Sequence, residues 1–186
     1  MRHKYSTQAV VLARNPLAEA GMLVTLLTPS LGLIRARAQG VRRSGAKLAH
    51  ALQTLHASDI ILVRGKEGWR LTGALLVEDC FSDLSHEARL RAGRVAGLLL
   101  RLVHGELAEP ALYYYFYEFV RTLPLLSTEE QDSAESLVAL RLLHALGSDA
   151  GALPPEGYTK EALEHALSGR KDLIVRINRG ITTSGL

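Results

Sequence analysis

The hydrophobic periodicity of this chain changes once, near residue 84. Before that point apolar and polar residues alternate, as they do in half-buried β-strands. After it, apolar residues recur at the three- and four-residue spacing of one helix face. The sequence therefore predicts an α+β chain in two parts. A β-rich domain is expected over residues 1–80 and an all-helical domain over residues 81–186.

Five segments of the first part carry strand signals, and the first three end at turn residues, namely Asn15-Pro16, Pro29 and Gly40. A short helix is predicted between the third and the fourth strand. The expected strands are residues 5–14, 21–28, 31–39, 54–64 and 69–78, and the helix is residues 46–52. This order is that of a five-stranded OB-fold β-barrel, a fold that binds nucleic acid or sugars. The pattern also leaves an SH3-like barrel open.

The second part predicts helices separated by glycine and proline. They cover residues 86–105, 110–123, 128–147 and 159–169, and a last apolar segment follows at 172–181. The aromatic run YYYFYEF lies in the second of these helices. Helical spacing places Phe116, Phe119 and Leu123 on one buried stripe and leaves some tyrosines nearer the surface.

Positive charge is concentrated in the first part. Residues 1–80 carry 11 Lys and Arg against 5 Asp and Glu, whereas residues 81–186 carry 11 against 14. Such asymmetry is typical of a domain that meets a polyanion. Ordinary solubilising charge would also produce it.

Several classes of protein are disfavoured by absent signals. No apolar run approaches the ~20 residues of a membrane helix. The N-terminal residues MRHKYSTQ do not lead into the apolar core of a signal peptide. The one cysteine, Cys80, makes neither an intrachain disulfide nor a cysteine-type zinc site. These features predict a cytoplasmic protein without a metal or another cofactor.

The first candidate binding site follows the third predicted strand. Alternation places Arg35 and Arg37 on the outer face of this strand, opposite a small apolar face. The cations continue through Arg42, Arg43 and Lys47, with no acid between them. Glycines within this stretch would let the backbone approach a phosphate. We expect these five side chains to contact the phosphates of a nucleic acid; a solvated loop is the alternative.

A second, weaker basic cluster flanks the turn between the last two strands. It consists of Arg64, Lys66 and Arg70, and Glu67 dilutes its charge. In OB-folds this turn forms one wall of the binding cleft. Trp69 lies in the same segment and could stack on a base. Because it is in phase with Leu71, Leu75 and Val77, a place in the core or between domains is the stronger expectation.

Signals for catalysis are poor. The seven histidines show no metal-ligand spacing, and neither of the common nucleotide-binding glycine motifs is present. Glu78, Asp79 and Asp83 could form an acidic metal site near the expected domain junction. A magnesium-dependent nuclease and an RNA-binding OB module therefore remain alternatives to a DNA-binding protein that is not an enzyme.

The first part resembles the N-terminal domain of the RecO family of bacterial recombination mediators. The matching features are Glu19, the segment LVTLLTP followed by Gly32, the segment Gly40-Val41-Arg42-Arg43, and LAHALQ at the same spacing. The resemblance covers residues 4–80. The helical part matches more loosely, at SLVALRLLHALG over residues 136–147.

The resemblance implies a nucleoid-associated protein of recombinational repair that binds single- and double-stranded DNA and anneals complementary strands. With a RecR-type partner it would help to load RecA onto strands coated by single-strand-binding protein, whose acidic tail it would contact. The chain departs from the family at Gly21 and Met22, where an acid and an arginine are usual, and at Ala46, where a serine is common. Many members carry a four-cysteine zinc site where this chain has SDAGALPPEG, at residues 148–157, so no zinc is expected.

Overall fold

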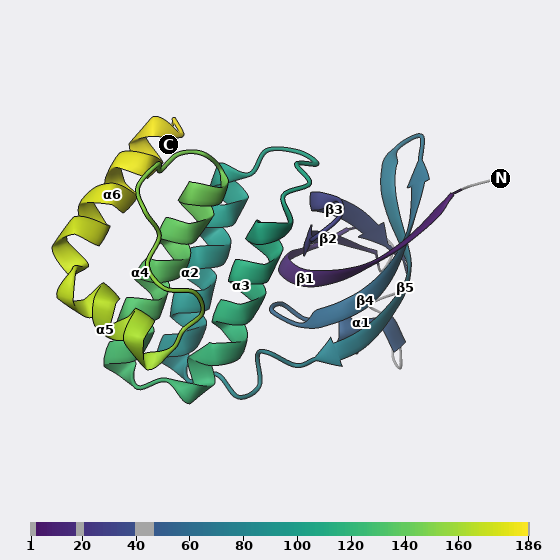
Figure 1. Cartoon of the computed structure of the whole chain (residues 1–186). Coiled ribbons are helices and arrows are strands. Elements are labelled where there is room, and N and C mark those ends of the chain that lie inside the picture. The colour runs from purple at the N-terminus through teal and green to yellow at the C-terminus, as the bar shows by residue number, and fades with distance from the viewer. Residues whose placement is uncertain (1–2, 18–20, 40–46, 186) are drawn as a thin grey trace. The chain divides into compact units, whose positions relative to one another are not determined.

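Five strands close into a barrel in the order β1-β2-β3-β5-β4 (Figure 1). The computed structural model describes residues 3–17, 21–39 and 47–185. The barrel elements are β1 (Lys4–Pro16), β2 (Met22–Thr28), β3 (Gly32–Ala38), α1 (Lys47–Ala51), β4 (Ala57–Gly65) and β5 (Gly68–Glu78). β3 and β5 pair in parallel, and the other neighbours pair antiparallel. The predicted OB-fold barrel followed by helices is confirmed.

Strand alternation builds the barrel core. In β3, Ile34, Ala36 and Ala38 are buried inside, while Arg35 and Arg37 are exposed outside, as predicted. Leu52, just after α1, is also buried in this core, so α1 closes the barrel between β3 and β4. Met22 lies in the same core.

A bulge in β5 corrects one expectation. Ile61 pairs with Gly73 and Leu62 with Leu71, so Thr72 is an extra residue. An extra residue reverses the side-chain alternation beyond it. Trp69 and Leu71 are therefore buried in the core, as expected, but Leu75 and Val77 are 69% and 50% exposed. The prediction that all four share one face is wrong.

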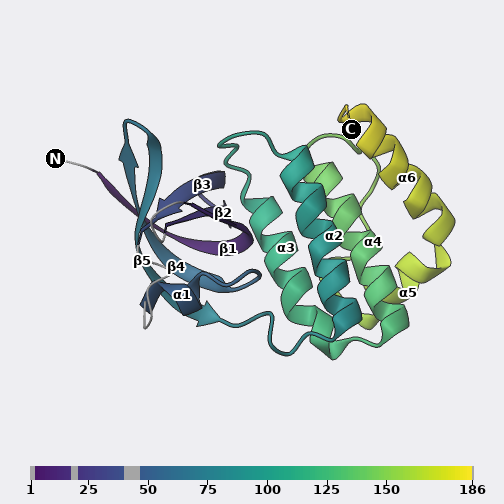
Figure 2. The same cartoon turned by 180° about the vertical axis from the view of Figure 1, so that it is seen from behind.

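The helical part begins after a link from β5. Its elements are α2 (His86–Leu102), α3 (Pro110–Thr122), a 3₁₀ turn (Leu123–Leu125), α4 (Thr128–Ala145), α5 (Lys160–Ser168) and α6 (Arg170–Thr183). Ser85, Ser127 and Thr159 cap α2, α4 and α5, each by accepting a backbone hydrogen bond. α4 packs against α2 on one side and against α5 and α6 on the other (Figure 2). None of the described helices combines the length and apolar composition of a membrane crossing.

The aromatic run packs as expected. Phe116, Phe119 and Leu123 are fully buried, whereas Tyr114 is exposed. The stripe therefore forms part of the core of the helical part.

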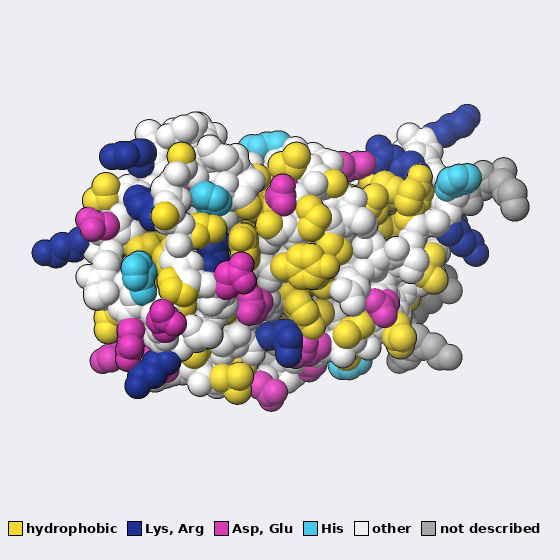
Figure 3. Space-filling view, in the orientation of Figure 1, with side chains coloured by type: hydrophobic (Ala, Val, Ile, Leu, Met, Phe, Trp, Pro, Cys, Tyr) yellow, Lys and Arg dark blue, Asp and Glu magenta, His cyan; other side chains and the backbone are white. Residues whose placement is uncertain are grey.

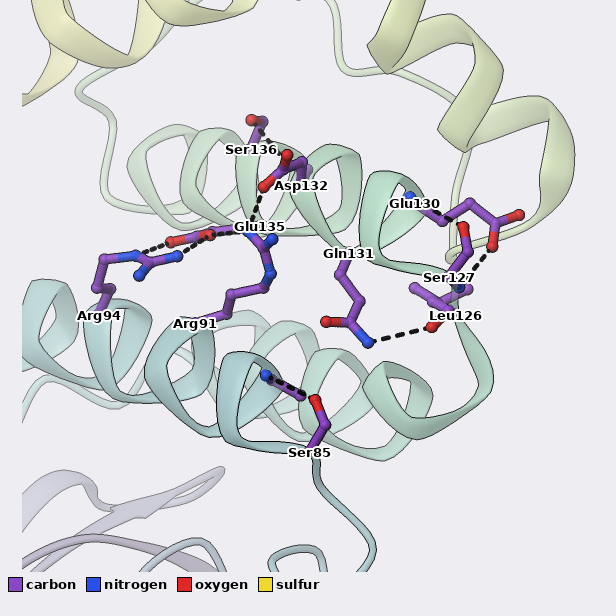
Figure 4. Close-up of polar contacts among 11 residues, drawn as sticks. Ser85, Arg91, Arg94, Leu126, Ser127, Glu130, Gln131, Asp132, Glu135 and Ser136 are labelled. Carbon is purple, nitrogen blue, oxygen red and sulfur yellow. Dashed lines mark hydrogen bonds and ion pairs between the residues drawn. The ribbon is translucent and has the colours of Figure 1, made fainter.

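Ion pairs join α2 to α4 (Figure 4). Arg91 bonds Asp132 and lies 3.1 Å from Glu135. Arg94 makes a bidentate pair with Glu135, with N–O distances of 2.6 and 2.7 Å. The hydrogen bond to Glu135 raises the pKa of Arg94 above its ordinary value, despite partial burial that acts in the opposite direction. These bonds fix the register of the two helices.

Two arginines hold the loop at residues 148–157. Arg141 of α4 is 2% exposed and donates to the carbonyl oxygens of Pro155 and Gly157, at 2.6 and 2.8 Å. Its guanidinium carbon lies 5.1 Å from the ring centre of Tyr158. Arg176 of α6 makes a bidentate pair with Asp149, at 3.0 and 2.5 Å. Arginine side chains thus hold this loop, which contains no cysteine.

The chain gathers into two compact units. The first contains residues 1–82 and also residues 104–113, and the second contains residues 83–103 and 114–186. The sequence predicts that the segment 104–113 belongs to the helical domain. In the structure this segment groups with the barrel unit. Within that unit, the backbone of Leu107 lies against Gly32, the first residue of β3.

Candidate nucleic-acid interface

Arg37 of the first predicted basic cluster and the whole second cluster line one pocket beside the turn between β4 and β5. The pocket has a volume of about 680 Å³ and is lined by Arg37, Gln39 and the segment Val63–Arg70. Four of its lining residues are cations from the predicted set, namely Arg37, Arg64, Lys66 and Arg70. Figure 3 shows Lys and Arg side chains gathered around the tip of this hairpin, at the upper right.

Strand pairing explains why Arg37 lies beside the second cluster. β3 and β5 run in parallel, and Arg37 stands opposite Arg70 in their register. Neighbouring residues in register point to the same side of a sheet. Arg37 is thereby placed beside the second cluster, although it lies 33 positions before Arg70 in the sequence. The pairing of like charges costs stability unless a counter-charge is near.

One such counter-charge is Glu67 in the turn. Its carboxylate lies 2.6 Å from Arg37, and both side chains are largely exposed. Exposed pairs of this kind contribute about 0–1 kcal/mol and are screened by salt. A phosphate can therefore replace Glu67 at little cost.

A second carboxylate, Glu106, comes from the segment 104–113. Its Oε1 atom accepts a hydrogen bond from Trp69 Nε1 at 2.9 Å and another from Arg64. Burial alone would raise the pKa of Glu106, but these two hydrogen bonds and the charge of Arg64 outweigh it, so the pKa falls below its ordinary value. The Arg64 guanidinium carbon lies 4.7 Å from the indole centre of Trp69. Two hydrogen bonds and one cation–ring contact thus link Arg64, Trp69 and Glu106.

The remaining predicted residues are placed unevenly. Arg35 is exposed on the same face as Arg37 but does not line the pocket. Arg35, Lys66 and Arg70 make no ion pair within the part of the chain that the structure describes. Arg42 and Arg43 lie outside the described residues. Lys47 begins α1, and its side chain is likewise not described.

Sequence reasoning missed Glu106. It lies 37 residues from Trp69 in the sequence, between two helices, and no local pattern marks it. Only the return of the chain from α2 to the barrel brings its carboxylate to Arg64 and Trp69.

The acidic residues of the nuclease alternative do not converge. Asp79 Oδ1 accepts backbone hydrogen bonds from Phe81 and Ser82, both at 3.0 Å, and Oδ2 accepts the Ser82 hydroxyl at 2.5 Å. His56 Nε2 lies 3.0 Å from the same carboxylate. Among the residues described, no group of three or more acids, histidines or cysteines is arranged to hold a metal. Asp79 instead caps the turn that follows β5.

This turn gives a pH-dependent prediction. The Ser82 hydroxyl, followed by the backbone amides and the His56 charge, lowers the pKa of Asp79 to about 2 against the effect of burial. A depressed pKa contributes stability above the unfolded value of 3.8, which is lost as the pH falls toward 2. Asp79→Asn should therefore cost about 1–2 kcal/mol at pH 7 in urea unfolding. The difference from the wild type should shrink between pH 4 and about pH 2; a constant difference would contradict the assignment.

Comparison with known sequences fits this geometry. The family model described as "Recombination protein O N terminal" matches residues 1–79. A DNA repair protein RecO of Dehalococcoides mccartyi is 30% identical over 171 residues, which are 91% of this chain and 62% of that protein.

Two cyanobacterial relatives extend the comparison. A DNA repair protein RecO of Nostoc punctiforme is 26% identical over 155 residues, 83% of this chain and 51% of that protein. One of Synechococcus elongatus is 39% identical over 71 residues, 38% of this chain and 27% of that protein. The chain spans about three fifths of the length of the first relatives that it matches, at 62%. The barrel thus matches the family's N-terminal model, and most of the chain is similar in sequence to proteins named DNA repair protein RecO.

Proposed function

We propose that this chain binds DNA during recombinational repair, through the basic pocket beside the β4–β5 turn. The observation that carries the proposal is the meeting of Arg37, Arg64, Lys66 and Arg70 at one pocket of a RecO-type barrel. Arg35 would extend this surface along β3. Arg42, Arg43 and Lys47 follow in the sequence and would add to it.

The chemistry is that of phosphate binding. Lys66, Arg70 and Arg35 are exposed and make no ion pair in the described ranges, so they can meet phosphates directly. Arg37 would exchange Glu67 for a phosphate. Such contacts carry no base information, so binding should be largely independent of sequence and should weaken steeply with salt.

The family resemblance extends the proposal beyond binding. A cationic surface screens the repulsion between two strands, which favours annealing of complementary DNA. We further propose that a RecR-type partner and the tail of single-strand-binding protein contact this protein, and that it assists RecA loading without being an enzyme. Strand annealing in the presence and absence of single-strand-binding protein tests this part separately from binding.

The double variant Lys66→Ala/Arg70→Ala tests the pocket. We expect its affinity for single-stranded DNA to fall about tenfold at moderate salt, because two phosphate contacts are lost. The slope of log affinity against log salt should also become shallower by about 1.5. Fluorescence anisotropy with a labelled oligonucleotide measures both quantities, and the same variant should anneal strands more slowly.

A matched control removes two cations elsewhere. Arg170 and Lys171 are exposed on α6, and Arg170→Ala/Lys171→Ala changes the net charge by the same amount. Equal losses in the two double variants would show that only net charge matters and would contradict the pocket. A labelled RNA strand of the same sequence tests the RNA alternative, because a reader of the 2′-hydroxyl should prefer RNA.

A further inference from the structure

We propose that the pocket holds one unpaired nucleobase, stacked on the guanidinium of Arg64. The inference rests on the proposed function, and it adds the part of the nucleic acid that the pocket takes. A pocket that takes an unpaired base selects single strands over duplexes. A base in a duplex has both faces covered by its neighbours, whereas an unpaired base can be turned out of the strand.

The stacking surface is Arg64 rather than the tryptophan. Trp69 is 7% exposed and packs in the barrel core, so a base cannot lie on its ring. Arg64 lies over that ring, 4.7 Å from its centre, and its side chain is 49% exposed. Arg64 thus contacts the indole and also lines the pocket, where its exposed side chain can meet a base. Bases stack on arginine planes as well as on aromatic rings.

This surface is held in place before any ligand arrives. Glu106 accepts hydrogen bonds from both Arg64 and Trp69. Tyr5 also contacts the indole, with its ring edge-on at a centroid distance of 5.1 Å. A side chain that is already fixed loses less conformational entropy on binding. Arg64 thus offers a preorganised plane, which a freely moving surface arginine does not.

The rest of the pocket suits a nucleotide. Its volume of about 680 Å³ lies in the range of sites that enclose small molecules. Lys66 and Arg70 stand around it for the adjoining phosphates, and Gln39 offers an amide that can both donate to and accept from a base edge. A stacked base with flanking cations is the arrangement by which single strands are bound with little sequence preference.

The test compares strands with and without bases. Oligothymidylate and an abasic strand of equal length carry the same phosphates, so their difference in affinity reports on the base alone. We expect the wild type to bind oligothymidylate about tenfold more tightly than the abasic strand. The Arg64→Lys variant keeps the positive charge but loses the planar guanidinium group on which a base would stack. It should bind both strands about equally, at the affinity of the wild type for the abasic strand.

The chain provides its own reporter, because Trp69 is its one tryptophan. Its emission should change on binding oligothymidylate and stay nearly constant on binding the abasic strand. A strand carrying one 2-aminopurine gives a readout that needs no variant, since stacking quenches this base. Quenching by the wild type supports the proposal even where Arg64→Lys fails to fold.

Each outcome decides a separate point. Equal affinity of the wild type for the two strands overturns the base pocket and leaves DNA binding intact. Base dependence that survives in Arg64→Lys overturns the role of Arg64. Equal base dependence with oligouridylate supports the pocket and shows that it accepts either nucleic acid. A wild type that binds none of these strands contradicts both the pocket and the proposed function.

Discussion

Replacing Arg141 with methionine should lower the free energy of unfolding by about 3 kcal/mol. Its guanidinium supplies hydrogen bonds to the carbonyl oxygens of Pro155 and Gly157 and lies on the ring of Tyr158. Methionine fills much of the volume but leaves both carbonyls without this donor. Exchanging a buried charge for an apolar group is often neutral when both partners are replaced. Here only one partner changes, so the cost remains.

Urea unfolding measures this loss. A pocket of about 670 Å³ beside Arg141 and residues 153–157 would let water reach part of the loop, which limits the cost. Arg101→Met, at an exposed position of α2, is the control and should change the stability by less than about 0.5 kcal/mol. A loss below about 1 kcal/mol for Arg141→Met would show that the loop does not depend on this side chain.

Replacing Gly32 with alanine should destabilise the barrel unit by about 3 kcal/mol or more. Gly32 has a φ of +69°, and an added Cβ would lie 2.0 Å from the carbonyl oxygen of Leu107. The clash is with backbone, which a rotamer change cannot relieve. The segment 104–113 would have to move away, and Glu106 would leave Trp69. Tryptophan emission should therefore shift in the folded variant, in addition to the lower unfolding midpoint.

Gly147→Ala separates backbone strain from the clash. Gly147 has a φ of +72°, and an added Cβ there meets no atom within 4 Å. It should cost about 1–2 kcal/mol, the penalty of a left-handed conformation alone. Equal losses in the two variants would mean that the close approach of Leu107 to Gly32 contributes nothing to stability.

The order of the elements could be predicted from the sequence because it depends on local patterns. Alternation assigned Ile34 to the core and Arg35 to the surface, and the structure confirms both. Periodicity failed where the strand is irregular. The extra residue Thr72 turns Leu75 outward, and nothing in the alternation before it announces a bulge.

Only part of the candidate site could be predicted from the sequence. Each basic cluster was visible as a run of cations, but the placement of Arg37 beside the second cluster depends on the parallel pairing of β3 with β5, a contact between distant segments. Glu106 was invisible because its role comes from a return of the chain to the barrel. Long-range contacts of this kind are decided by the assembled fold rather than by propensity.

The distribution of the chain between its units has a consequence for how this protein can be taken apart or recombined. The barrel unit is discontinuous in sequence, since it consists of residues 1–82 and 104–113 with α2 encoded between them. A gene fragment that stops at residue 82 would therefore express a barrel without the acceptor for Trp69 and without the backbone that covers Gly32. Exchange of domains between related genes at a single crossover after residue 82 would likewise combine a barrel from one parent with the segment 104–113 from the other. Each unit is compact, but the barrel unit cannot be separated from the helical unit by one cut in the chain.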